Sequence, residues 1–385
     1  MRIVHVVGSA QLKSGGPIEG IRQRAMILKQ MGHSVDIVTL DAPDAPDLDQ
    51  LGLPVHAMGP TKSTFGYCPR LKPWLEAHYK DYDIFIVNGL WQYHGIAVHQ
   101  VAKKHKLPYF VFCHGMLDPW FNTTYPLKKL KKMVYWPWQH AVLRDARAVL
   151  FTTEEEKILA RESFKPYKVV ERVVPYGTAT PPPASEQQST AFFELVPNVK
   201  GKKIILSLGR LHPKKGLDLL IEAFYLVFGS DPRWVLVAAG PDEEGSKEKL
   251  QGLAAGLGIA NRVFWPGMLR GDAKWGAFRA AEGFLLPSHQ ENFGISVAEA
   301  LGCGTPAFIS NKVNIWREVV AEGAGVAAPD TIDGTVELLR KLAAMTPSEL
   351  SDMGQRAEAC FAKHFEASRM ATGLLEVIEE LGKPS

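Results

Sequence analysis

The chain has 385 residues, of which 46% are hydrophobic and 22% are charged, and its formal net charge is +3. This length exceeds one ordinary domain and suits two domains of roughly 150 to 200 residues each. The near balance of charge excludes a generally basic protein that coats nucleic acid, so we expect no nucleic-acid partner.

Short β-branched runs alternate with helical stretches in the first half of the chain, a pattern typical of a parallel sheet. The chain begins almost directly with a strand, so we expect no signal peptide. No apolar run approaches the roughly 20 residues that span a bilayer, and the scattered cysteines fit a reducing compartment. We therefore expect a cytoplasmic protein. A helix is predicted over 18–31. The predicted strands are 2–7, 34–40, 83–88, 108–113, 147–152 and 169–174.

A proline-rich polar stretch at 180–189 predicts a linker, after which the alternation begins again. Helices are predicted over 218–228, 295–301 and, at the end of the chain, 368–381. The predicted strands of this half are 203–208, 234–239, 263–265, 283–286 and 306–309. We therefore predict an α/β protein with two doubly wound domains. Its expected parts are a first domain at 1–179, a linker at 180–202, a second domain at 203–365 and a terminal helix at 366–385.

Two glycine-containing turns are candidates for anion binding. Gly15 and Gly16 stand directly before the first helix, where bare backbone amides attract anions, although a flexible glycine turn explains them equally well. A second turn, 209–216, follows the first strand of the second half. The planar guanidinium of Arg210 can bind phosphate oxygens through two parallel hydrogen bonds, and Lys215 adds a point charge. A solvated basic loop is the alternative, but the place at a strand end favours ligand binding.

A third candidate is 291–300, predicted as a loop that leads into a helix near Gly294. The amides of Phe293, Gly294 and Ile295 would then point at a ligand. Glu291 sits in the loop, and Glu299 lies over one turn into the helix, about 7 Å further on at 1.5 Å per residue, so the two carboxylates could hold hydroxyls of two sugar rings. A surface glutamate and a helix cap are the alternative. The apolar residues on both sides of Glu299 make that alternative less favourable for this residue.

The pairing of G-R-x-x-P-x-K-G at 209–216 with E-x-F-G-x-x-x-x-E-A at 291–300 resembles the retaining family-4 glycosyltransferases, the glycosyl transferases group 1. The resemblance extends to Gly15-Gly16, to Cys113-His114-Gly115, to Pro175-Tyr176-Gly177 and to the closing helix. It implies the GT-B fold, in which two Rossmann-like doubly wound domains face each other across a cleft. It also implies that the first domain serves the acceptor, that the second binds the nucleotide sugar, and that the closing helix crosses back to the first domain.

The resemblance also implies roles for residues of the second domain. Arg210 and Lys215 match positions that neutralise the donor diphosphate. Glu291 matches a residue near the transferred sugar, and Glu299 matches a ribose-binding carboxylate. The loop whose backbone holds the sugar hydroxyls corresponds to Asn292, Phe293 and Gly294, and Met268 corresponds to a residue beside the base.

In the first domain, Gly16 matches a glycine that lets the backbone approach phosphate or acceptor. His114 matches a histidine that contacts the donor sugar, although a lone histidine at a strand end is often structural. Asn88, at another strand end, belongs either to an acceptor loop or to a simple turn. Tyr176 departs from the family, because many relatives have asparagine there.

The expected reaction moves a hexose from a nucleoside-diphosphate sugar, with UDP-glucose or a similar UDP-sugar favoured, to a glycan or lipid-linked acceptor in cell-surface polysaccharide assembly. Arg210, Lys215 and helix amides would stabilise the leaving diphosphate without a metal, so no metal or other cofactor is expected. The resemblance implies retention of the anomeric configuration. Three alternatives stay open: a GDP-mannose donor, a sugar-nucleotide epimerase, and a non-catalytic nucleotide-sugar-binding subunit.

A basic segment, 128–132, contains four lysines and is flanked by aromatic residues. One interpretation is docking on anionic lipid, which would place the protein on the inner face of the cytoplasmic membrane. The other is a solvated helix face whose aromatic residues belong to the core.

Overall fold

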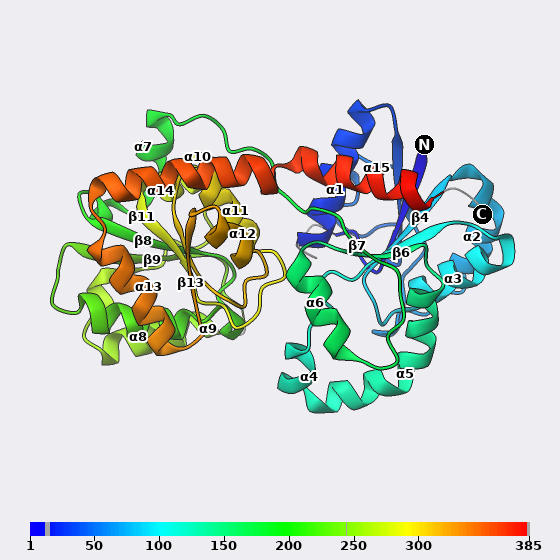
Figure 1. Cartoon of the computed structure of the whole chain (residues 1–385), viewed down its shortest axis with the longest axis horizontal. Coiled ribbons are helices and arrows are strands. Elements are labelled where there is room, and N and C mark those ends of the chain that lie inside the picture. Colours follow the sequence, from blue (N-terminus) through cyan, green and yellow to red (C-terminus); the bar gives the residue numbers. More distant parts are fainter. Residues whose placement is uncertain (12–15, 244, 383–385) are drawn as a thin grey trace. The chain divides into compact units, whose positions relative to one another are not determined.

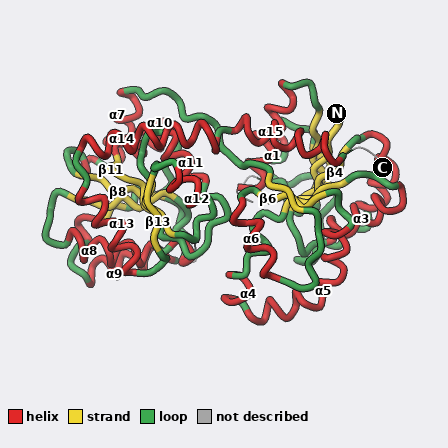
Figure 2. Tube along the Cα trace, viewed as in Figure 1, coloured by secondary structure: helices red, strands yellow, loops and turns green. Residues whose placement is uncertain are grey.

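The computed structural model describes residues 1–11, 16–243 and 245–382, and the chain folds into two compact units. Unit 1 comprises residues 1–177 together with the C-terminal segment that begins at Ala367, and unit 2 comprises Thr178–Glu366. Each unit has its own parallel sheet with helices around it, as Figure 1 and Figure 2 show.

Unit 1 contains a seven-stranded sheet in the order β3-β2-β1-β4-β5-β6-β7, and every neighbouring pair is parallel. The strand order reverses between β1 and β4, and such a reversal is where doubly wound sheets bind ligands. The strands are β1 Arg2–Val7, β2 Ser34–Thr39, β3 Val55–Ala57, β4 Ile84–Asn88, β5 Tyr109–Phe112, β6 Ala148–Phe151 and β7 Glu171–Val173. The helices of this unit are α1 Gly16–Gln30, α2 Leu71–His78, α3 Tyr93–His105, α4 Trp120–Thr124, α5 Pro126–Arg144, α6 Glu154–Ser163 and α15 Ala367–Leu381, with single 3-10 turns at Asp49–Leu51 and Tyr79–Asp81.

The sheet of unit 1 is apolar on both faces because helices cover both. Side chains alternate along a strand, so Ile84 and Ile86 of β4 join one core cluster while Phe85 and Val87 join another. The first cluster also contains apolar side chains of α1 and of the closing helix α15, which run side by side in Figure 1. The end of the chain therefore completes the core of the first unit.

Unit 2 contains a six-stranded parallel sheet in the order β10-β9-β8-β11-β12-β13, which reverses between β8 and β11. The strands are β8 Lys203–Leu208, β9 Trp234–Ala239, β10 Val263–Phe264, β11 Ala281–Leu286, β12 Ala307–Ser310 and β13 Gly325–Ala328. The helices are α7 Glu186–Leu195, α8 Leu217–Phe228, α9 Ser246–Gly256, α10 Gly271–Ala280, α11 Ile295–Gly302, α12 Trp316–Ala321, α13 Ile332–Ala344 and α14 Pro347–Cys360. Short turns lie at Pro197–Val199, Pro213–Lys215 and Ala260–Arg262, and a π-helical turn lies at Phe361–Phe365.

The stretch predicted as a linker, 180–202, contains a helix that the sequence analysis did not predict, α7. Ser185 accepts a hydrogen bond from the backbone N–H of Gln188 and so caps α7, which packs against α10. The two helices can approach closely because Gly276 has no side chain, and a Cβ there would lie 2.0 Å from the Gln188 carbonyl oxygen. Within the expected linker, residues 180–185, 196 and 200–202 lie outside helices.

The structure confirms the prediction of two doubly wound α/β domains. It adds two strands that the sequence did not reveal, β3 and β13. Strand β3 has three half-buried residues at an edge, and β13 consists of Gly325, Val326 and two alanines, so neither carries a β-branched run. Among the described residues, no helix is both long and apolar enough to cross a membrane.

Candidate functional site

In unit 2 the two strongest sequence motifs follow the two strands that flank the reversal of strand order. Residues 209–216 leave the end of β8, and residues 287–294 leave the end of the neighbouring strand β11. Because parallel strands end at the same edge of the sheet, the fold brings the two motifs together. The backbone N–H of His289 donates to the carbonyl of Lys214, at 2.8 Å between nitrogen and oxygen.

Gly216 is the residue that allows the two loops to meet. Its φ of +65° lies in the left-handed region, and a Cβ there would stand 2.2 Å from the carbonyl oxygen of Pro287. His212 begins the preceding 3-10 turn by accepting a hydrogen bond from the Lys214 N–H. The turn ends at Gly216, and α8 starts directly after it.

Three cationic side chains leave the 209–216 loop. Lys215 forms an ion pair and hydrogen bond with Glu291, and both side chains are largely buried. Lys214 donates to the amide oxygen of Gln290 at 3.4 Å. Arg210 is half exposed and pairs with Glu243 at 2.8 Å. Sequence reasoning predicted Arg210, Lys215 and Glu291, and missed the contributions of Gln290 and Glu243.

Glu291 is ionised inside this cluster. Burial alone would raise the pKa of its carboxyl group, but the charges of Lys215 and Lys214 outweigh burial, and the pKa lies below the ordinary value of 4.5. Its charge therefore stabilises the fold above that value, and this contribution is lost as the pH falls through the lowered pKa. Burial lowers the pKa of Lys214, and Glu291 opposes that effect.

The loop that contains Asn292 and Phe293 ends at Gly294, which has a φ of +83° and precedes the first residue of α11, Ile295. Phe293 is buried and packs edge-on against Phe365. No side chain among the described residues caps this helix end. The N-terminus of α11, which is the positive end of the helix dipole, therefore lies at the loop that contains Glu291.

Glu299 lies more than one helical turn after the start of α11. It forms an ion pair with Lys274 of α10, at 2.8 Å between the Glu299 Oε1 and Lys274 Nζ atoms. Both side chains are mostly buried, and the Lys274 ammonium also lies 3.9 Å from the centre of the Trp275 ring. Glu299 is thus a paired carboxylate rather than an isolated surface group. Lys274 was missed because it lies 25 residues before Glu299, without a motif of its own.

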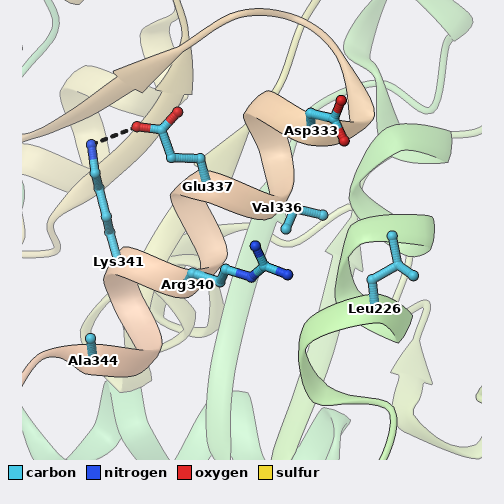
Figure 3. A pocket seen from close by; sticks show the side chains of 7 residues that line it. All are labelled: Leu226, Asp333, Val336, Glu337, Arg340, Lys341 and Ala344. Atoms are coloured by element: carbon cyan, nitrogen blue, oxygen red, sulfur yellow. Dashed lines mark ion pairs between the residues drawn. The ribbon is translucent and has the colours of Figure 1, made fainter.

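Two further features of unit 2 are the side chain of Met268 and a surface hollow. Met268 is 52% exposed, and its sulfur lies 3.0 Å from the Arg270 Nε atom. A hollow between α8 and α13 is lined by apolar and charged side chains, with an ion pair between Glu337 and Lys341 (Figure 3). None of the predicted site residues lines that hollow.

In unit 1 the predicted anion-binding turn is only partly described. Gly15 lies outside the described residues, and Gly16 is the first residue of α1. Two turns further on, Arg24 is fully buried, with its guanidinium 4.7 Å from the centre of the Phe112 ring. Tyr176, where the sequence departs from the family, is also buried and packs against α1, since a Cβ at Gly20 would touch its ring.

Asn88 and His114 lie together at the ends of the adjacent strands β4 and β5. The amide nitrogen of Asn88 donates to the carbonyl oxygen of Ile86 at 3.1 Å and lies 3.0 Å from His5 Nδ1. A carbonyl oxygen can only accept, so this contact orients the amide and places its oxygen towards His114. The His114 Nε2 atom lies 3.1 Å from that oxygen and must donate its proton to it.

These contacts make His114 a neutral imidazole with its proton on Nε2 and its lone pair on Nδ1. Burial, followed by the charge of Arg24, lowers the pKa of His114 to about 3. Its backbone is held at a φ of +49°, an unusual value for a residue with a side chain. At neutral pH His114 can accept a hydrogen bond through Nδ1 but is not positively charged. Asn88 is buried, and its amide is used within the protein, so a substrate contact by Asn88 stays a prediction.

Asn88→Asp should raise the pKa of His114 by about 1 to 3 units, because it places a buried negative charge beside the imidazole. Long-range 1H–15N correlation spectra of the imidazole nitrogens measure both the tautomer and the titration. His5 and His94 also contact residue 88, so their signals are followed in the same spectra. Asn122→Asp, also at a buried asparagine of unit 1, is the matched control. A wild-type His114 that titrates near 6.5 would contradict the assignment.

The comparisons with known proteins place the chain in a class. Residues 189–359 match the family of glycosyl transferases group 1, and residues 15–177 match the glycosyl transferase 4-like domain. The chain therefore belongs to the glycosyltransferases of this family, which confirms the resemblance found in the motifs.

Particular relatives are similar at moderate identity. Mannosylfructose-phosphate synthase of Agrobacterium fabrum is 24% identical over 346 residues, which cover 80% of this chain and 73% of the relative. D-inositol 3-phosphate glycosyltransferase of Rhodococcus opacus is 30% identical over 248 residues, or 62% of this chain and 54% of the relative, so that match spans about half of its length.

Among solved structures, HepE of Anabaena in complex with UDP and glucose superposes with a TM-score of 0.79 at 17% identity, over 99% of this chain and 100% of that one. At this identity the likeness shows the GT-B fold.

Proposed function

We propose that this protein is a retaining, metal-independent hexosyltransferase whose donor is a UDP-sugar such as UDP-glucose. The observation that carries the proposal is the cationic cluster of Arg210, Lys214 and Lys215 at the reversal of strand order in unit 2, beside the open end of α11. Cations and a helix N-terminus at one sheet edge are suited to a diphosphate. They also stabilise the charge that develops when the diphosphate leaves.

The donor site is assigned residue by residue. Arg210 and Lys215 bind the diphosphate, and Glu291 and the backbone of Asn292, Phe293, Gly294 and Ile295 hold the transferred sugar. Glu299 binds the ribose and Met268 lies beside the base. A UDP donor is supported by the likeness to HepE, which is solved with UDP and glucose. His114 accepts a sugar hydroxyl through Nδ1, and substitution takes place on the leaving-group face.

The acceptor is a glycan or a lipid-linked sugar in cell-surface polysaccharide assembly. A mannosyl donor is the second candidate, because the chain is similar over most of its length to mannosylfructose-phosphate synthase. An epimerase that releases free sugar and a non-catalytic binding subunit are the remaining alternatives.

A thermal-shift screen with UDP, GDP and ADP tests the donor, since a ligand of the native state raises the unfolding midpoint. We expect UDP to stabilise the protein most, and GDP to do so if the donor is GDP-mannose. The nucleotide sugar selected in this way is then incubated without an acceptor and with candidate acceptor sugars. Product formation should persist in excess EDTA, because the positive charge comes from side chains. A reaction abolished by EDTA and restored by manganese would overturn the metal-independent mechanism, and no stabilisation by any nucleotide would overturn the donor site.

A further inference from the structure

The helix α5 of unit 1 has two apolar faces, of which only one is used inside the protein. Trp136 and Leu143 are buried, the Trp136 ring nitrogen donates to the carbonyl of Pro166, and Gln139 accepts from the backbone N–H of Trp91. These contacts hold one side of the helix firmly against the unit. In Figure 1, α4 and α5 lie at the border of unit 1.

The opposite side of α5 is an apolar stripe that faces away from the core. Its members are spaced three, four and four residues apart, so they share one face of the helix. Their exposed fractions are 80% for Leu127, 61% for Leu130, 66% for Val134 and 59% for Trp138. Soluble monomers seldom present such a contiguous row of large apolar side chains to water, and where one occurs it commonly marks an interaction site.

The charge around the stripe has a single sign. From Pro119 to Arg144 the sequence contains no aspartate or glutamate, although the whole chain has 41. Lys128, Lys129 and Lys131 are exposed on α5. Lys132 points back towards the unit, with its ammonium 4.9 Å from the centre of the Trp91 ring, so it is not part of the outward surface as the sequence suggested.

We propose that the apolar row Leu127, Leu130, Val134 and Trp138, here called the α5 stripe, docks on the surface of an anionic lipid bilayer. The exposed lysines of the same helix segment, Lys128, Lys129 and Lys131, supply the positive charge around it. An apolar row enters the boundary between headgroups and acyl chains, lysines bind the anionic headgroups, and a tryptophan sits at the interface. Anionic lipid is favoured over a protein partner because it offers negative charge along the whole stripe without needing a matched shape. The proposal does not depend on the reaction, because it concerns adsorption alone.

Cosedimentation of the full chain with vesicles tests the proposal. We expect binding to phosphatidylglycerol–phosphatidylcholine vesicles and little binding to phosphatidylcholine alone. The variant Lys128→Ser/Lys129→Ser/Lys131→Ser should lose about fivefold in affinity per lysine, or roughly 100-fold in all, at low salt. The variant Leu130→Ser/Val134→Ser/Trp138→Ser should lose binding at low and at high salt, because it removes the apolar part that salt does not screen.

Two matched controls separate the stripe from surface composition in general. Leu195→Ser/Leu226→Ser changes exposed leucines of unit 2, and Lys29→Ser/Lys200→Ser/Lys249→Ser changes exposed lysines elsewhere. Both controls should bind vesicles like the wild type. All the changed side chains are exposed, so the unfolding midpoints should stay the same, and each is measured.

Three results would overturn the proposal. The first is a wild type that does not bind anionic vesicles, and the second is stripe variants that bind as well as the controls. The third is a wild-type dimer in sedimentation velocity that the stripe variants turn into a monomer without any vesicle binding, because a second copy would then be the occupant. Transfer to a soluble acceptor by the stripe variants is measured in parallel, so that failure of docking and failure of the proposed activity are distinguished.

Discussion

Lys215→Met should lower kcat/KM by about 10² to 10³, the loss typical of removing one donor that stabilises developing negative charge. Lys215 is the largely buried cation of the 209–216 loop and already pairs with a carboxylate, so its ammonium is held in place in the free protein. Initial rates of transfer or of donor hydrolysis measure the effect. Because the positive charge matters most as the diphosphate leaves, we expect kcat to fall more than KM rises.

Two variants accompany this measurement. Lys249→Met changes an exposed lysine of α9 and should behave like the wild type. Lys215→Arg keeps the charge and should retain more activity than Lys215→Met, although Arg does not reproduce the geometry of Lys. A Lys215→Met enzyme within threefold of the wild type would remove this residue from the mechanism.

The second large effect distinguishes Glu291 from Glu299. Glu299 is assigned to ribose, away from the bond that breaks, so Glu299→Ala should weaken the binding of UDP alone and of the full donor alike. A hydrogen bond to a charged group corresponds to about one to two decades in affinity. Glu291→Ala should leave UDP binding intact or tighter, because it frees Lys215, while kcat falls by about one to two decades.

Isothermal titration calorimetry with UDP alone measures the binding free energy without the transferred sugar, and so separates the contribution of the ribose contact from that of the sugar contact. Glu248→Ala on α9 is the matched control, and it should change neither quantity. The opposite pattern, with UDP lost in Glu291→Ala and retained in Glu299→Ala, would show that the two roles are assigned to the wrong carboxylates.

The strands that bury a continuous apolar run were predictable from the sequence to the residue, as β1, β8 and β9 show. Periodicity and turn residues are local signals, and a buried parallel strand produces both. The two motifs 209–216 and 291–300 were assigned to one donor site through the family resemblance, and the adjacency of β8 and β11 that brings 209–216 to 287–294 is seen in the structure. The helix α7 was missed because a proline run precedes it, although Ser185 was its visible cap.

The partners of the site residues could not be predicted, since they depend on packing between distant segments. The Asn88 amide nitrogen lies 3.0 Å from the imidazole of His5, 83 residues earlier, and Glu299 is paired by Lys274 on a neighbouring helix. For α5, the sequence also left open which face of the helix is buried. Both of its helical faces are apolar in the sequence, and only the packed structure decides that Trp136 points inward and Trp138 outward.

Unit 1 is closed by a helix from the far end of the chain, and this has a consequence for synthesis on the ribosome. The 189 residues of 178–366 are translated between the first segment of unit 1 and α15. At about 5 to 20 residues per second this takes roughly 10 to 40 s. During that time the sheet face lined by Ile84, Ile86 and Phe110 has α1 but lacks α15, while unit 2 is continuous and can fold as it emerges. The second unit therefore has the opportunity to reach its native state first, and a nascent chain stopped before Ala367 leaves the first unit with an apolar face for chaperones to bind.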